Sequence, residues 1–352
     1  MHKILKFILM GLFALCIGVQ AEDFERGGKG TLIQCEKDSD YSYFLRLPKN
    51  YDPSRAEKWP VLFVMSPEGG EPHIFNRYSS GADMCGWILA LSVESKNAND
   101  GGVSHSAIMA MVEDVFDRFP VDEERCYASG MSGGGREAFW LANNLKKSII
   151  GIIPCGAGDA GNPVNNRALA YGLSGSTCFN RWDMTITFNQ RIKKRGVLRF
   201  FPGMHDWAES GLIQQAMVWL NGQYLKEEGK DSEIQDFSGR LMTEIKNYLK
   251  RDPTRAYEAS TVLSEIQGAP DAKAAMEIRK ELQEMPEVKT YLAALDDVAE
   301  FADDHFNTDV QDYRNNRTTK RSEQDSQKLV EKYKGTPYEE LMRRLGEPTQ
   351  EF

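Results

Sequence analysis

Two patterns of apolar and polar positions divide the chain. From residue 41 to about residue 225, short apolar runs alternate with helical stretches and glycine-rich turns. The runs are residues 43–47, 60–65, 125–129, 149–155, 168–173 and 197–201. Short apolar runs between helices are typical of a mainly parallel sheet covered on both faces. We therefore predict an α/β fold with a doubly wound, mainly parallel sheet.

Beyond residue 226 the apolar period becomes helical. One stripe repeats every four residues, and a second follows further along the chain: Phe237, Leu241, Ile245 and Leu249, then Val288, Leu292, Leu295 and Val298. This spacing predicts amphipathic helices. We expect an α/β domain over residues 22–228 and a charged, all-helical C-terminal region over residues 229–352. The stripes either pack on each other or bind a protein partner or a second copy.

The first residues have the pattern of an export signal. Lys3 and Lys6 precede the uncharged apolar run 7–19, and Val19-Gln20-Ala21 resembles a cleavage site. The run is short for a bilayer span, although an uncleaved anchor is the alternative. We predict a signal peptide over residues 1–21, a periplasmic or extracellular protein, and no membrane span after cleavage.

Charge and cysteine content narrow the classes of partner. The 352 residues carry a formal charge of −9, and loss of residues 1–21 removes two lysines and takes it to −11. An acidic chain is a poor candidate for binding nucleic acid or an anionic membrane.

Of six cysteines, Cys16 leaves with the signal. Export puts the remaining five in a disulfide-permissive compartment, where an odd number leaves at least one unpaired within the chain.

The strongest chemical motif surrounds Ser132. Gly130-Met131-Ser132-Gly133-Gly134 has the form G-x-S-x-G, follows a predicted strand and precedes a predicted helix over residues 136–145. This context is that of a nucleophile elbow, whose sharp turn exposes the serine hydroxyl at a helix N-terminus. Side chains in place of the flanking glycines would clash with the facing strand and helix. We predict Ser132 as a nucleophile; the alternative is a βα turn with an idle serine.

A serine nucleophile needs a base, and the chain has five histidines. His205 lies in Pro202-Gly203-Met204-His205-Asp206-Trp207, after the last predicted strand and before a predicted helix over 211–220. That is where an α/β-hydrolase carries its base. We predict His205 as the general base, against the alternative of a surface-loop histidine.

An oxyanion hole needs two convergent N–H donors. Gly133, the residue after the nucleophile, supplies one. The second is expected from the loop after run 60–65, which reads Ser66-Pro67-Glu68-Gly69-Gly70. Because Pro67 has no N–H, Glu68 or a following glycine must donate. A carboxylate beside an oxyanion is unfavourable, so the Glu68 side chain must point away.

Together, the run 60–65 with its glycine-rich loop, the elbow at Ser132 and the His205 loop resemble secreted α/β-hydrolases. The similar group is that of esterases and polyhydroxybutyrate-depolymerase-like proteins, which includes feruloyl and acetyl-xylan esterases. The resemblance covers about residues 40–225. It implies a Ser–His–acid hydrolase and implies nothing about the helical region.

The chain departs from this group at the acid. Similar proteins read Gly-x-x-Asp-Phe-Asn after the penultimate strand, whereas residues 175–180 here place Cys178 at the aspartate. Losing the acid of a known triad costs about 10⁴-fold. Asp159, after the preceding strand, and Asp183, one turn beyond Cys178, are alternative acids. The third possibility is a catalytically degenerate hydrolase that acts as a binding or scaffold protein through its helical region.

Two further patterns concern cysteines and cofactors. Cys155 and Cys178 end strands that we expect to be neighbours, so we predict a disulfide between them. Residues 156–161 match a dinucleotide fingerprint, but Pro163 falls where its helix should begin and the unit comes late in the sheet. No metal-ligand spacing occurs either. We predict no cofactor and no metal.

The sequence as a whole predicts a secreted serine esterase. We expect its substrate to be a carboxylic ester and, since no lid insertion is evident, one with an exposed acyl group such as an ester on a carbohydrate. Trp182 and Trp207 lie beside the predicted site and would suit a sugar or aromatic acyl group, although tryptophan is more often core.

Overall fold

The computed structural model describes residues 24–307 and 318–349, so the predicted signal peptide lies outside the described residues. One eight-stranded sheet has the order β1-β2-β4-β3-β5-β6-β7-β8. Its strands are β1 (Thr31–Gln34), β2 (Ser42–Arg46), β3 (Trp59–Met65), β4 (Ile88–Ser92), β5 (Val121–Met131), β6 (Ile149–Cys155), β7 (Leu169–Gly175) and β8 (Gly196–Phe201). Strands β3 to β8 pair in parallel, and β1 and β2 are antiparallel. The predicted α/β-hydrolase sheet is confirmed.

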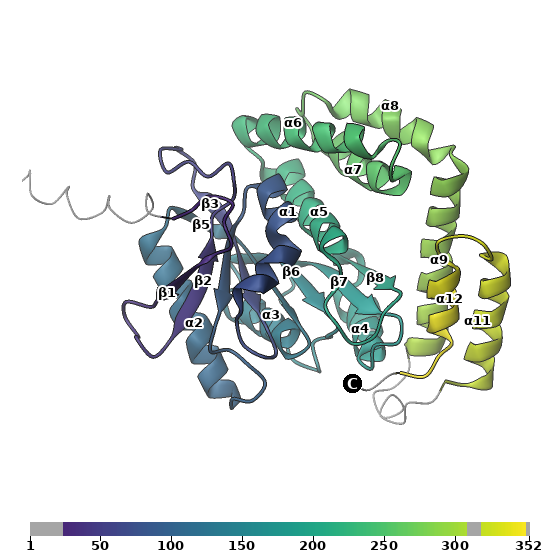
Figure 1. The fold of residues 1–352 in the computed structure, drawn as a ribbon, viewed down its shortest axis with the longest axis horizontal. Helices are drawn as coiled ribbons and strands as arrows, with labels where there is room; N and C mark the ends of the chain where they lie inside the picture. Colours follow the sequence, from purple (N-terminus) through teal and green to yellow (C-terminus); the bar gives the residue numbers. More distant parts are fainter. Residues whose placement is uncertain (1–23, 308–317, 350–352) are drawn as a thin grey trace, which may run out of the picture.

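Helices cover both faces of the sheet (Figure 1). They are α1 (Phe75–Cys85), α2 (Gly101–Arg118), α3 (Gly133–Asn144), α4 (Arg181–Ile186) and α5 (Ser210–Glu228). Successive β3 side chains point to opposite faces of the sheet. Leu62 and Val64 pack with α1 and α5 on one face, whereas Val61 and Phe63 pack with α2 and α3 on the other. Burial on both faces explains why β3 is apolar without a polar alternation.

Two strands were not among the predicted runs. Strand β1 is short, and Leu32 within it is 56% exposed, so it has little apolar pattern. Strand β4 follows Gly86, which ends α1 in the left-handed conformation. Its sequence Ile-Leu-Ala-Leu-Ser is apolar except for the last residue and buried throughout, and so short an apolar run does not distinguish a buried strand from a helix.

The C-terminal region is helical, as predicted. It contains α6 (Asp231–Tyr248), α7 (Pro253–Glu265), α8 (Ala272–Gln283), α9 (Pro286–Phe306), α11 (Lys320–Lys332) and α12 (Glu339–Leu345). In Figure 1, α6 to α8 lie above the sheet domain, and α9 descends beside α11 and α12. No helix within residues 24–307 and 318–349 combines the length and apolar character needed to cross a bilayer.

The first predicted stripe packs on the α/β domain. Phe237, Leu241 and Ile245 are buried in the same core as α1 and α5. Gly222 in α5 permits the close approach of α7, because a Cβ on it would lie 2.3 Å from Cγ1 of Val262. Arg125, at the start of the buried part of β5, also donates to Glu233 of α6 at 2.8 Å. The stripe is therefore covered by the chain's own core.

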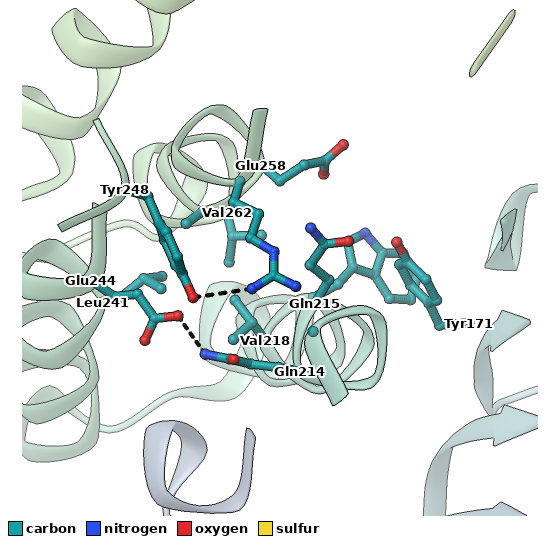
Figure 2. Close-up of a pocket in the computed structure, with 13 residues that line it drawn as sticks. Tyr171, Gln214, Gln215, Val218, Leu241, Glu244, Tyr248, Glu258 and Val262 are labelled. Atoms are coloured by element: carbon teal, nitrogen blue, oxygen red, sulfur yellow. Dashed lines mark hydrogen bonds between the residues drawn. The ribbon is translucent and has the colours of Figure 1, made fainter. Parts of the chain in front are cut away.

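A polar junction with a small cavity lies where α5, α6 and α7 meet (Figure 2). The Arg255 guanidinium donates to the Tyr248 hydroxyl at 3.2 Å, and Gln214 donates to Glu244. This cavity measures about 30 Å³, roughly the space of one water molecule. It has no room for an organic ligand.

The last helices pack beside the loop that follows β7. Arg181 is fully buried, and its guanidinium donates to the Ser176 carbonyl and, at 2.9 Å, to the Glu347 carbonyl. Phe306 of α9 packs edge-on against Trp182, with ring centroids 5.2 Å apart. Trp182 is thus a core residue at this interface. The C-terminal region and the 175–180 loop support one another.

Candidate active site

Ser132 lies on a strained turn between β5 and α3. Its φ of 53° and ψ of −118° are rare for a side-chain-bearing residue, and its N–H donates to the Cys155 carbonyl at 2.9 Å. The flanking glycines are required by space. A Cβ on Gly130 would lie 2.4 Å from the Gly134 backbone, and one on Gly134 would lie 2.3 Å from the Met65 carbonyl oxygen. This geometry is that of a nucleophile elbow.

His205 lies on the loop between β8 and α5. Its Nε2 is 2.8 Å from Oγ of Ser132, so the predicted nucleophile and base are brought together. The imidazole is 5% exposed, and the ring of Phe179 packs against it with centroids 3.9 Å apart. Gly156, at φ +58°, lies behind the ring, where a Cβ would be 3.2 Å from Nδ1. The imidazole is thus held in a fixed position.

The other imidazole nitrogen faces Cys178. Sγ of Cys178 lies 3.0 Å from Nδ1 of His205 and accepts the Asn180 N–H at 3.4 Å. The loop carrying Cys178 is bound to the histidine loop, since the N–H of Thr177 donates to the Gly203 carbonyl at 2.9 Å. The predicted nucleophile Ser132, the predicted base His205 and Cys178 are therefore joined by successive contacts in that order.

A thiol at this position differs chemically from a carboxylate. Burial raises the pKa of Cys178 to about 12, so the group is a neutral thiol near pH 7. A neutral thiol can accept a hydrogen bond from Nδ1–H. In that tautomer Nε2 carries no proton and is free to receive the proton of the serine hydroxyl. It can instead donate to Nδ1, which puts a proton on Nε2 and gives the unproductive tautomer. The thiol also supplies no negative charge to stabilise an imidazolium.

The electrostatic surroundings keep His205 neutral. Burial lowers the pKa of His205 to about 4, the Arg136 guanidinium acts in the same direction, and Asp206 opposes it. Arg136 follows Ser132 by one helical turn, and its guanidinium donates to Oδ1 of Asn180 at 3.4 Å. The imidazole is therefore in its proton-accepting form at neutral pH, but its cationic form is costly.

The two alternative acids have other partners. Asp159 binds the Arg191 guanidinium and accepts the Gly161 N–H at 2.7 Å. Asp183 accepts the Gly158 N–H at 3.1 Å and lies 4.0 Å from Arg136. Burial raises the pKa of both carboxyls. These contacts fix the loop after β6, whereas Nδ1 of His205 is met by Cys178.

The predicted disulfide is wrong, because Cys155 and Cys178 are both free thiols. Sγ of Cys155 instead accepts the Ala208 N–H of the histidine loop at 3.2 Å. Cys35, Cys85 and Cys126 are also free and buried. The expectation rested on neighbouring strand ends, and β6 and β7 are indeed paired, but strand adjacency does not fix where the side chains point.

The predicted oxyanion donors come from adjacent strand ends. Gly133 begins α3, and Glu68 lies in the turn after β3 with its side chain exposed. Asn97, which sequence reasoning missed, connects these elements. Its N–H donates to the Pro67 carbonyl at 2.9 Å, and its amide oxygen occupies the space that a Cβ on Gly133 would need. Asn97 follows a strand that was not predicted, so no pattern indicated it.

Comparison with known proteins gives similarity of fold only. No protein-family model matches the chain, and no curated protein matches it in sequence. Among solved structures, the chain is similar to the fluorophosphonate-binding serine hydrolase F of Staphylococcus aureus. The two share 15% identity, with 55% of this chain and 99% of that chain covered and a TM-score of 0.44.

Two other solved structures are similar over a comparable share of the chain. The S-formylglutathione hydrolase of Staphylococcus aureus is 16% identical, with 55% and 95% of the two chains covered and a TM-score of 0.45. A ferulic acid esterase is 15% identical, with 53% and 95% covered and a TM-score of 0.43. In each case little more than half of this chain is matched.

Proposed function

We propose that the protein is an exported serine hydrolase that cleaves carboxylic esters through Ser132 and His205. The observation that carries the proposal is the 2.8 Å contact between Oγ of Ser132 and Nε2 of His205 at a strained elbow. A serine hydroxyl needs such a base to become nucleophilic, and the turn strain persists only where surrounding structure enforces it.

The proposed reaction has two stages. Oγ of Ser132 attacks the ester carbonyl carbon while Nε2 of His205 takes the hydroxyl proton, and the N–H groups of Gly133 and Glu68 stabilise the oxyanion. Collapse breaks the ester bond, and the departing alcohol receives the proton from His205. Water, deprotonated by His205, then attacks the acyl carbon on Ser132. The bond from that carbon to Oγ breaks, the acid leaves, and His205 returns its proton to Oγ of Ser132.

In this proposal Cys178 occupies the acid position and orients His205 weakly. The thiol contacts Nδ1 but is neutral, so it neither selects one tautomer strongly nor stabilises the imidazolium. We expect a slow enzyme that works best on activated esters. Asp159 and Asp183 would then act in positioning the loop after β6.

The test is hydrolysis of p-nitrophenyl acetate by the full chain without its signal. Turnover should depend on Ser132 and be lost in Ser132→Ala, whereas Ser129→Ala, three residues earlier on β5, is the matched control for serine removal. Turnover that persists in Ser132→Ala would contradict the proposal. Finding the protein only in the cytoplasm of its cells would contradict the proposed export.

A second candidate function is a degenerate hydrolase that binds a partner. The neutral thiol at the acid position favours it. Of the two predicted helical stripes, the one at Phe237, Leu241 and Ile245 is, however, buried against α1 and α5. We therefore favour the esterase.

A further inference from the structure

Arg181 is a fully buried cation whose hydrogen-bond acceptors are backbone carbonyls. It is the first residue of α4 and directly follows the loop that carries Cys178. Its guanidinium donates to the Ser176 carbonyl, to the Leu345 carbonyl at 3.4 Å and to the Glu347 carbonyl at 2.9 Å. One side chain therefore joins the loop at the acid position to the end of the C-terminal region.

Aromatic rings complete the surroundings of this guanidinium. Its central carbon lies 4.4 Å from the ring centroid of Trp182 and 4.3 Å from that of Phe306 in α9. Burial lowers the pKa of Arg181, because a cation taken out of water is stable only while other groups replace that water. Its Nε already lacks an acceptor among the described residues. Loss of the Leu345 and Glu347 carbonyls would leave most of its N–H groups unpaired.

The loop before Arg181 supplies two of the groups that hold the His205 imidazole. Sγ of Cys178 lies 3.0 Å from Nδ1, and the Phe179 ring packs against the imidazole with centroids 3.9 Å apart. The backbone N–H of Arg181 donates to the Cys178 carbonyl at 3.0 Å. A displacement of Arg181 would therefore be passed to both groups that contact the base.

We propose that Arg181 is a positioning residue for the reaction, and that residues 345–347, which we call the C-terminal strap, hold it in the active arrangement. The inference rests on the proposed function. It gives the C-terminal region a part in the reaction, because the strap fixes the loop that faces the base.

Gly346 allows the C-terminal strap to be shifted without a change in the loop at the acid position. A Cβ on Gly346 would lie 2.5 Å from both Cβ and Oγ of Ser326 in α11. Its φ of −81° suits any residue, so Gly346→Val acts through this clash and should displace the carbonyls on either side. Gly222→Ala is the matched control, since its clash with Val262 falls between α5 and α7, which do not include the strap.

The first readout is hydrolysis of p-nitrophenyl acetate by the full chain. Gly346→Val and Arg181→Lys should each lower kcat about tenfold or more and leave KM within about threefold, because Arg181 acts on the base and not on the substrate. Lysine keeps the charge but lacks the planar fork that joins the two segments. Gly222→Ala should keep kcat within about twofold. An equal loss of kcat in Gly222→Ala would reduce the effect to stability and overturn the inference.

The second readout is alkylation by iodoacetamide, which needs no activity. Cys178 and Cys126 are both fully buried, so each reacts only when its surroundings open. In Gly346→Val and Arg181→Lys, we expect the alkylation rate of Cys178 relative to that of Cys126 to rise about tenfold or more, as measured by peptide mapping. Gly222→Ala should leave this ratio within about twofold. An unchanged ratio in both strap variants would show that the loop does not depend on Arg181.

The two readouts separate this inference from the proposed function. Wild-type protein without turnover would contradict the esterase, and the alkylation ratio alone would then decide the role of the C-terminal strap. Turnover with an unchanged kcat in Gly346→Val and Arg181→Lys would overturn the positioning role and leave the esterase standing. Should Gly346→Val fail to fold, Gly346→Ala, which introduces a smaller clash, takes its place.

Discussion

Sγ of Cys178 lies 3.0 Å from Nδ1 of His205, at the position where the resemblance in sequence predicts an aspartate. The backbone of the 175–180 loop thus presents its side chain to the imidazole as a triad loop does. The chemistry differs, because a buried thiol with a pKa near 12 is neutral. The geometry of a triad is present, and the charge is missing.

Restoring that charge should accelerate the reaction. In Cys178→Asp, the carboxylate would accept a hydrogen bond from Nδ1–H of His205, which selects the productive tautomer and stabilises the imidazolium. We expect kcat/KM for p-nitrophenyl acetate to rise by about 10²-fold, less than the full triad effect because the loop is not adapted to aspartate. The measurement is steady-state hydrolysis at pH 7.

The matched control is Cys178→Ser, which keeps a small neutral donor and acceptor. Its kcat/KM should stay within about threefold of the wild type. If Cys178→Asp folds, as judged by its unfolding transition, and yet gains nothing, the proposed role of this position is wrong.

The pH dependence of the reaction should reflect the buried imidazole. Only neutral His205 accepts the serine proton, and its pKa is about 4. The kcat/KM of the wild type should therefore rise with pH through about 4 and stay level to about 8. In Cys178→Asp, the adjacent carboxylate favours the imidazolium, so this acidic limb should move to higher pH by about one unit or more. If the acidic limb of the wild-type profile instead lies at about pH 6.5, the ordinary pKa of a solvated histidine, the predicted effect of burial is wrong.

The two aspartates near the site should have little effect on chemistry. Asp159 is bound to Arg191, and Asp183 to the Gly158 N–H. Asp159→Asn and Asp183→Asn should each leave kcat/KM within about fivefold of the wild type, while lowering the thermal midpoint through loss of buried contacts. A loss of about 10³-fold in either variant, with the fold intact, would identify that residue as the acid.

Docking of the helical region on the α/β domain should depend on Gly222. Because its Cβ would lie 2.3 Å from Val262, Gly222→Ala should lower the free energy of unfolding by about 2 kcal/mol. Gly239→Ala in α6 has open space around its Cβ and should be neutral or stabilising by up to about 1 kcal/mol. Denaturant unfolding compares the two. Equal effects would show that α5 and α7 do not need this close approach.

Much of the sheet could be predicted because its strands are buried on both faces. The predicted runs correspond to β2, β3 and β5 to β8, and the run 149–155 coincides with β6. Strand β1 escaped prediction because Ile33 is its one buried residue. The fate of the stripe at Phe237 could not be predicted either, since helical periodicity shows that a face is covered but not by what.

In the candidate site, the local sequence predicted a residue's role only where the backbone geometry restricts which residue types can occupy a position. The elbow needs glycine at fixed positions, which is why Ser132 could be recognised. Contacts between loops distant in sequence left no pattern: Asn97 against Gly133, and Arg136 against Asn180, follow from the packing of strand ends. The thiol pair shows the same limit, because β6 and β7 are paired and yet Sγ of Cys155 contacts Ala208 whereas Sγ of Cys178 contacts His205.

The most direct test of the account is covalent labelling by a fluorophosphonate, which reacts with a serine only where a base activates it. Intact-mass spectrometry of the full chain should show one adduct, and peptide mapping should place it on Ser132. Ser132→Ala should remain unlabelled, and His205→Ala should label far more slowly. Unlabelled wild-type protein, or an adduct on another serine, would contradict the claim that Ser132 and His205 form a working nucleophile and base.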